Sequence, residues 1–585
     1  MNPVDFAWAA VQSIVQKSPK DIKVIVDGTE YPHLERDSVG YVIHLSGPKR
    51  VREGLLSLHG LFFDNDNEGK ASLWRMFRAS LYHLSLHAAI TDYSIYQDFA
   101  ISYNANNAMF AISMAEDFAI RGFGRVMWPG LLLDEAHANY LTSLRFRNVL
   151  LLSDEKEISD LVAANLLSYQ MTGKPIAKVL VEDLDKEIEM VHASLAKYSS
   201  EISRIYGIGV GNKTRELELE ALPRLKLAAA ETVVRLFEDK NLYLSNVHAL
   251  PYADAHGKNL FFGDTLIALD PESKTTAMQD ALAELSITAP GNKIRAEEST
   301  LQAEGNATLG DWEYSMIQKQ RLIDLYKALD PKTHFEEFAF PVEDYAEFVR
   351  TRSRLIGPIR RVLDQLRIVR NVADDIDMKE SGYVDVPIAI QVIASKSDRR
   401  DVFIQEETEK KSEAWGILID SSKSLETLKG QVRDIAVCLS EVARDLIPDQ
   451  GSWAVYSFNE RMYIIKDFSE IYGSQAKSRI GGLGNGVKTY LPDAVRIASK
   501  RLAKSHEQLK VLLVASDGFP LGYEGIDKDL VQAIETANHA GIELIGLGVG
   551  SSLISKYFRS NCLIEGPFDL MNHFVKTYVE LSSSN

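Results

Sequence analysis

The sequence lacks three features that would indicate an extracellular or membrane protein. It has only two cysteines in 585 residues, Cys438 and Cys562, which excludes a disulfide scaffold and fits a reducing compartment. No window approaches the roughly 20 apolar residues of a membrane helix. The first 20 residues contain acidic Asp5 and no sustained apolar core, unlike a secretory signal. We therefore expect a cytoplasmic protein without membrane insertion.

Basic residues are also scarce relative to acidic ones. The chain has 65 Lys and Arg against 82 Asp and Glu, a formal net charge of −17. An acidic surface repels phosphate backbones, so we expect no nucleic-acid partner. The most basic short stretch, Lys500–Lys504, is typical of a solvated helix face.

The pattern of elements predicts four parts. Short apolar runs at Lys23–Val26 and Tyr41–Leu45 indicate strands, and a stripe from Trp74 to Ala88 has helical spacing. A further helix is expected over Val342–Val372, kinked or split at Gly357-Pro358. The parts are a mixed N-terminal domain over 1–150 that is mostly helical after 70, a helical middle region with long loops over 151–340, a helical lead-in and linker over 341–411, and a last domain over 412–585.

The last domain alternates apolar strands with amphipathic helices. Ala414–Ile419, Lys510–Ala515 and Ile542–Val549 are almost free of polar residues, as expected of strands buried on both faces. Helices are expected between them. The sequence therefore predicts an α/β fold with a mostly parallel sheet and helices on both faces, preceded by a largely α-helical multi-part region.

Oxygen-bearing side chains stand where these strands end. Ligands of such sheets bind at the carboxyl ends of the strands, and magnesium prefers hard oxygen ligands. The residues therefore predict a Mg²⁺ (or Mn²⁺) site, whereas the simpler alternative is that Asp420 and the serines only cap the next helix. The predicted metal ligands are Asp420, Ser422, Ser424, Thr489 and Asp517.

These five residues match the metal-ion-dependent adhesion site of the von Willebrand factor A (VWA) family, which the domain resembles. Gly518 and Pro520 complete the Asp-Gly-x-Pro turn common in that family. The resemblance implies a dinucleotide-binding-like sheet with the ion at its top.

Flanking segments are similar to one group of VWA proteins, the NorD/CbbO type. The similar segments are Arg350–Val372, Asp375-Ile376-Asp377, Asp401–Ile404, Thr489–Arg496, Asp517–Gly525, Ala537–Ile542 and, faintly, Glu116-Asp117 and Pro129-Gly130-Leu131. Two features depart from the group's pattern: Pro492 replaces a usual glycine, and the arginine expected soon after Glu116-Asp117 is displaced to Arg121.

The resemblance implies a non-catalytic, chaperone-like activator. Proteins of this group work with MoxR-type AAA+ ATPases to activate or remodel a client metalloenzyme, such as nitric oxide reductase or Rubisco. The expected partners are thus a MoxR-type ATPase and a client enzyme. The alternatives are a stand-alone VWA ligand-binding or adhesion protein, and a metal-dependent hydrolase whose catalytic residues lie in the middle region.

Three other segments partly match known patterns of metal, phosphate or glycine-rich sites. His83 and His87 have the i, i+4 spacing of a zinc site, but no Glu follows His83, and we expect packed or capping histidines. Gly207–Thr214 is similar to a phosphate loop, but Asn212 replaces the required glycine and a helix precedes it, so we expect no nucleotide there. The glycines of Gly481–Gly486 are expected to let the chain turn tightly near the ion and to let Thr489 move.

Overall fold

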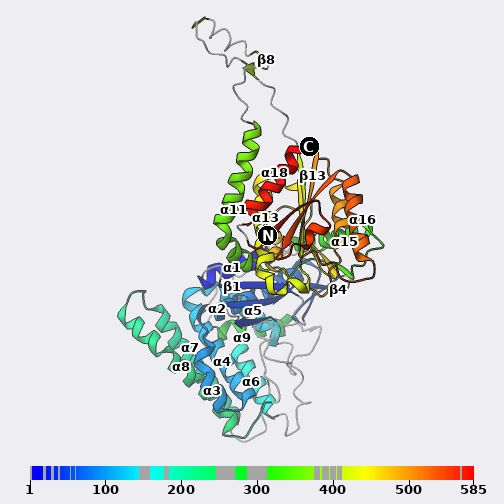
Figure 1. Ribbon diagram of the computed structural model, residues 1–585. Coiled ribbons are helices and arrows are strands. Elements are labelled where there is room, and N and C mark those ends of the chain that lie inside the picture. Colours follow the sequence, from blue (N-terminus) through cyan, green and yellow to red (C-terminus); the bar gives the residue numbers. More distant parts are fainter. Residues whose placement is uncertain are drawn as a thin grey trace. The chain divides into compact units, whose positions relative to one another are not determined.

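The computed structural model describes two compact units, Met1–Ser315 and Met316–Asn585 (Figure 1). The residues described are 3–17, 21–27, 32–36, 40–52, 54–59, 61–143, 158–176, 184–244, 271–285, 311–312, 314–374, 383–384, 394–395, 403–404, 412–566 and 569–584. The predicted segments at Asp375-Ile376-Asp377 and Asp401-Val402 lie outside them.

The first unit begins with two small sheets and continues as helices. One sheet has the order β1-β3-β2 and the other β4-β5-β6. Asp66 caps the long helix α2 by accepting a 2.7 Å hydrogen bond from the Gly69 amide. The elements are α1 (Pro3–Val15), β1 (Ile22–Asp27), β2 (His33–Arg36), β3 (Tyr41–Ser46), β4 (Lys49–Arg52), β5 (Leu55–Leu58), β6 (Leu61–Asp64), α2 (Asn67–Ile90), α3 (Gln97–Ser102), α4 (Ala105–Met127), α5 (Leu132–Ser143), α6 (Ile158–Thr172), α7 (Leu184–Gly207), α8 (Lys213–Glu238) and α9 (Pro271–Glu284).

The second unit is built on a seven-stranded sheet of order β15-β14-β13-β10-β11-β12-β7. Parallel pairing links every neighbour except β11 and β12, which are antiparallel. The elements are β7 (Glu337–Ala339), α11 (Tyr345–Asp374), β8 (Tyr383–Val384), β9 (Phe403–Ile404), β10 (Glu413–Asp420), α13 (Lys429–Leu446), β11 (Trp453–Phe458), β12 (Arg461–Lys466), α14 (Ser474–Gly481), α15 (Leu491–Leu502), β13 (Leu509–Ser516), α16 (Ile526–His539), β14 (Ile542–Val549), β15 (Ser560–Ile564) and α18 (Val575–Ser584), with a further helix over 314–329.

Helices cover both faces of this sheet, as the continuous apolar strands predict. One apolar core joins the sheet to α11, α13, α14 and α18, and a second joins it to α15, α16 and the helix over 314–329 (Figure 1). The prediction of a mixed α/β chain with a mostly parallel C-terminal sheet and a helical N-terminal part is confirmed. The sheet also includes β7, so its first strand lies well before residue 412, the expected start of the last domain.

The chain crosses from one side of β10 to the other, a reversal at which sheets of this kind commonly bind their ligands. β10 pairs with β11 on one side and with β13 on the other. Such a reversal of strand order opens a crevice at the carboxyl ends of the two central strands. These ends carry Asp420 and Ser516.

The helix expected over Val342–Val372 is present as α11, but it is not split at Gly357-Pro358. One helix runs from Tyr345 to Asp374 with Pro358 inside it. Its side chains pack against α13 and α14, and this tertiary packing offsets the hydrogen bond that the proline cannot donate.

Candidate functional site

Asp420 lies at the end of β10 and is completely buried. Its Oδ2 accepts a 2.6 Å hydrogen bond from the Ser516 hydroxyl at the end of β13, and its Oδ1 accepts a 2.9 Å bond from the Ser422 amide. The carboxylate is therefore held at a fixed position between the two central strands.

Asp517 follows Ser516 directly and is also buried. Its Oδ1 accepts a 3.0 Å hydrogen bond from the Phe519 amide. Burial raises the pKa of Asp420 to about 7, and the nearby Asp517 charge acts in the same direction. Within the residues that the structure describes, neither carboxylate pairs with a Lys, Arg or His side chain. Two adjacent buried acids thus have no protein cation to balance them.

The two serines do not serve as simple helix caps. Ser422 stands at the N-cap of the 3₁₀ turn Lys423–Leu428, but its side chain makes no capping hydrogen bond. The Ser422 and Ser424 hydroxyl oxygens lie 3.0 Å apart, and Ser424 is exposed to solvent. The alternative that these residues only cap the following helix is therefore wrong for the serine side chains.

Thr489 lies on a loop that pairs with the loops carrying the other predicted ligands. The Gly486 amide donates to the Ser421 carbonyl at 2.8 Å. Thr489 and Leu521 exchange two backbone hydrogen bonds of 2.9 and 3.1 Å. Thr489 is buried, so backbone pairing holds it beside the segment that follows Asp517.

The donor set fits a hard divalent cation. It offers two carboxylates and three hydroxyls on three neighbouring loops, which is the oxygen chemistry that Mg²⁺ and Mn²⁺ prefer. A cation would also stabilise the ionised form of the two buried carboxylates, whose charge otherwise carries a large desolvation cost.

Exposed apolar side chains lie on two of the loops that carry the predicted ligands. Phe519 and Leu521 are 55% and 63% exposed, and Val487, on the Thr489 loop, is 65% exposed. We call these three residues the apolar rim. Large apolar side chains gathered in water near a polar centre are typical of a protein-binding surface.

Gly518 shapes the turn between Asp517 and the rim. Its φ is +80°, and a Cβ at this position would lie 2.6 Å from the Ile554 amide nitrogen. Both the left-handed conformation and the close approach therefore require glycine.

Two of the glycines before Thr489, Gly481 and Gly482, have a different role from the one expected. None of the glycines in Gly481–Gly486 adopts a positive φ. Cβ atoms on Gly481 and Gly482 would lie 1.9 and 1.6 Å from the carbonyl oxygens of Asp344 and Val342. These two glycines allow α14 to pack closely against the segment before α11 and do not bring the chain to the ion.

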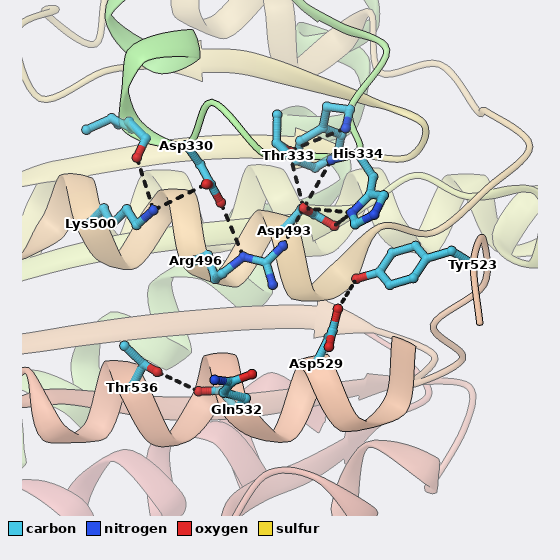
Figure 2. A network of polar contacts seen from close by, with 12 residues as sticks. Asp330, Thr333, His334, Asp493, Arg496, Lys500, Tyr523, Asp529, Gln532 and Thr536 are labelled. Carbon is cyan, nitrogen blue, oxygen red and sulfur yellow. Dashed lines mark hydrogen bonds and ion pairs between the residues drawn. The ribbon is translucent and has the colours of Figure 1, made fainter. Parts of the chain in front are cut away.

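The Thr489–Arg496 segment is tied to residues that precede β7, as Figure 2 shows. Buried Asp493 accepts hydrogen bonds from the His334 amide at 3.2 Å and from Arg496 at 2.5 Å. Arg496 also bonds Asp330 at 3.2 Å, and the Tyr523 ring stacks on His334 with centroids 3.9 Å apart. The network links α15, which begins two residues after Thr489, to the start of the second unit.

His83 and His87 converge on a third residue that sequence reasoning missed as a partner. They lie on α2, and their Nε2 atoms are 3.3 and 3.1 Å from Asp117 Oδ1 on α4. All three residues are buried. The i, i+4 spacing was visible in the sequence, but the packing of α4 against α2 was not.

The segment similar to a phosphate loop is a turn between two helices. It joins α7 to α8, and Asn212 caps α8 by accepting from the Thr214 amide at 2.9 Å. A helix, not a strand, precedes the glycines, so the strand-loop-helix context of a phosphate loop is missing at this segment.

Comparisons with known proteins do not assign the chain to a family. No family model matches the chain, and no curated protein matches it by sequence. Among solved structures, the Deinococcus radiodurans RO (RSR) protein aligns over 84% of this chain and 94% of its own, at 13% identity and a TM-score of 0.22. A TM-score this low does not establish a common fold.

In the described residues, we find no helix with the length and apolarity to cross a membrane.

Proposed function

We propose that the second unit contains a VWA-type domain whose Asp420 site binds Mg²⁺ or Mn²⁺. We further propose that the protein is a non-catalytic adaptor of the NorD/CbbO type. It would work with a MoxR-type AAA+ ATPase to activate or remodel a client metalloenzyme in the cytoplasm. Asp420, Ser422, Ser424, Thr489 and Asp517 would hold the ion.

The observation that carries the proposal is the pair of buried acids, Asp420 and Asp517, which have no cationic partner among the residues that the structure describes. A folded chain tolerates buried charge when a metal or an ion partner balances it. The pair also lies at the strand ends where doubly wound sheets bind their ligands.

The surroundings of the site favour docking over catalysis. Hydroxyls make up most of the donor set, so a bound ion would keep affinity for a further carboxylate. An acidic side chain of a partner would complete the coordination, while Phe519 and Leu521 would supply apolar contact next to it.

The Asp493 network supports a tie between the upstream segments and the ion loop. It holds residues 330–334 against α15, whose first turn follows Thr489. A force applied to residues 330–334 would therefore be transmitted to α15 and to the loop that carries Thr489. This is the mechanical link that an ATPase-coupled adaptor needs.

The test is a pull-down of the full chain with its candidate ATPase. The immobilised chain is incubated with a purified MoxR-type ATPase from the same source, with Mg²⁺ or with EDTA. We expect capture with Mg²⁺, reduced capture with EDTA, and the same reduction for Asp420→Ala. Thr536→Ala, which removes a surface hydroxyl on α16, is the matched control.

Three outcomes would contradict the adaptor role or favour an alternative. Absence of ATPase in the captured fraction under both conditions would contradict the adaptor role. A phosphatase or ATPase activity of the chain alone that disappears with Asp420→Ala would instead indicate a metal-dependent hydrolase. Exposure of the protein at the cell surface would indicate a stand-alone ligand-binding protein.

A further inference from the structure

Three metal-ligating atoms meet in the core of the first unit. His87 Nε2 lies 3.0 Å from His83 Nε2 and 3.1 Å from Asp117 Oδ1, and His83 Nε2 lies 3.3 Å from the same oxygen. The exposed fractions are 4% for His83, 0% for His87 and 7% for Asp117. The three atoms form a nearly equilateral triangle.

The hydrogen bonds around His87 fix which of its nitrogens carries a proton. The Thr91 hydroxyl donates to Glu116 at 2.8 Å, and that carboxylate also accepts from Tyr96 and from Lys226. The Thr91 oxygen must therefore accept the 3.0 Å bond from His87 Nδ1. In neutral His87 the proton lies on Nδ1, and the Nε2 lone pair faces the triangle.

This protonation brings two lone pairs together. His87 Nε2 and the Asp117 oxygen, 3.1 Å apart, both present electron density to the same point. Such an arrangement is repulsive unless a proton or a cation lies between the atoms. The His83 Nε2–H group, whose nitrogen is 3.0 Å from His87 Nε2, can donate that proton, or a metal ion can take its place.

We propose that His83, His87 and Asp117 bind a divalent transition-metal ion of the zinc type. Zinc lies about 2.0–2.1 Å from imidazole nitrogen and about 2.0–2.2 Å from carboxylate oxygen. An ion at that distance from all three atoms would sit about 1 Å out of the plane of the triangle. Two imidazoles and one carboxylate are a ligand set that zinc and iron(II) both use.

Neighbouring residues orient the ligands as outer-shell groups do in metal sites. Gln170 Nε2 on α6 donates a 2.8 Å hydrogen bond to Asp117 Oδ2, which leaves Oδ1 directed at the histidines. Thr91 fixes the His87 ring in the same way. The Thr91 contact raises the basicity of His87, and both contacts hold the ligands in place.

The ion would join α2 to α4 inside the helical core. This site is separate from the Asp420 site in ligand chemistry, because it uses imidazole nitrogen where the Asp420 site offers only oxygen. The two proposals can therefore fail independently.

The test is zinc binding by the full chain, purified without an affinity tag that binds metal and stripped with a chelator. Zinc chloride is titrated against a chromophoric competitor, and bound metal is counted by mass spectrometry. We expect one tightly bound zinc per chain. Affinity should fall at least about 100-fold in Asp117→Asn and His87→Gln, and about 10–100-fold in Thr91→Val.

Two controls separate this site from others. The double variant His33→Asn/His44→Asn removes the other described group of metal-ligating residues and should keep the tight zinc. Asp420→Ala should keep it as well. Zinc that disappears in either control, or that persists unchanged in Asp117→Asn, would overturn the proposal.

A wild-type measurement covers the case in which the ligand variants do not fold. Cobalt(II) replaces zinc in the stripped wild-type chain, and its visible spectrum reports the coordination. Intense ligand-field bands at one equivalent, abolished by one equivalent of zinc, are the expected result. A wild-type chain that takes up neither metal would show that the metal proposal is wrong.

Discussion

The Ser516 hydroxyl donates a 2.6 Å hydrogen bond to the Asp420 carboxylate, joining the ends of β13 and β10. The bond crosses the point where the sheet reverses its strand order. It links residues 96 positions apart and holds a buried acid in place beside a second acid, Asp517. The proposals for the second unit rest on this arrangement.

Gly518→Ala should disrupt the metal site. The substitution forces a side chain into φ +80° and places its Cβ 2.6 Å from the Ile554 nitrogen, so the Asp517 turn must move. We expect loss of Mg²⁺ binding and destabilisation of more than about 2 kcal/mol. Gly525→Ala is the matched control, because φ is +83° there but nothing lies within 4 Å. It should cost about 1 kcal/mol and retain the metal. Equal loss of metal in both variants would contradict this role of Gly518.

The apolar rim should contribute to partner binding and not to metal binding. We expect the double variant Phe519→Ser/Leu521→Ser to weaken ATPase or client capture about tenfold or more, the loss of about 1.4 kcal/mol. Its thermal midpoint and Mg²⁺ affinity should stay close to wild type, because both side chains are largely exposed. Val531→Ser, on the exposed face of α16, should change neither property. Unchanged capture by the rim variant would show that docking occurs elsewhere.

Asp493→Asn should loosen the segment before β7. The substitution removes the charge that Arg496 and the His334 amide share, at a cost of about 2 kcal/mol. Amide hydrogen exchange over residues 330–339 should accelerate about 10–30-fold. Lys500→Ala, which removes a half-exposed partner of Asp330, should leave exchange nearly unchanged. Equal rates in wild type and Asp493→Asn would contradict the tethering role.

Asp467 and Arg501 should give the second unit an acid-dependent stability. Burial alone would raise the pKa of Asp467, but two Arg501 hydrogen bonds of 3.0 and 2.9 Å, together with a Tyr326 bond, lower it to about 2. Because the folded-state pKa lies below the unfolded value of 3.8, the contribution is present at neutral pH. It is lost as pH falls from about 5 to about 2 and amounts to about 2 kcal/mol.

The check is the thermal midpoint of Arg501→Met relative to wild type across this pH range. We expect the variant to melt lower at pH 7 and the gap to close toward pH 2. Arg461→Met is the control, because its contact with Glu337 is 3.6 Å long and exposed. A gap that is constant with pH would show that the Asp467 carboxylate is not the group responsible.

Much of the second unit follows from local sequence. Continuous apolar runs identify β10, β13 and β14, since strands buried on both faces have few polar residues. Because parallel strands share their carboxyl ends, the meeting of Asp420 with the Ser516–Asp517 turn is also predictable.

Other features depend on tertiary contacts that no local pattern contains. β7 has three residues, and only its pairing with β12 makes it a strand. The roles of Gly481 and Gly482 depend on the distant carbonyls of Asp344 and Val342. Asp117 joins the two histidines only because α4 packs against α2, and helical periodicity gives the buried face of each helix but not its neighbour.

Manganese binding measured by electron paramagnetic resonance tests the Asp420 site most directly. Mn²⁺ is titrated into the full chain and into Asp420→Asn, with Asp117→Asn as the control for the histidine site. We predict one bound Mn²⁺ per chain that excess Mg²⁺ displaces, no such binding in Asp420→Asn, and unchanged binding in Asp117→Asn. In EDTA, Asp420→Asn should melt roughly 2–4 °C higher than wild type, because it removes a buried charge worth about 1 kcal/mol. Wild-type Mn²⁺ binding equal to that of Asp420→Asn would contradict the proposed metal site.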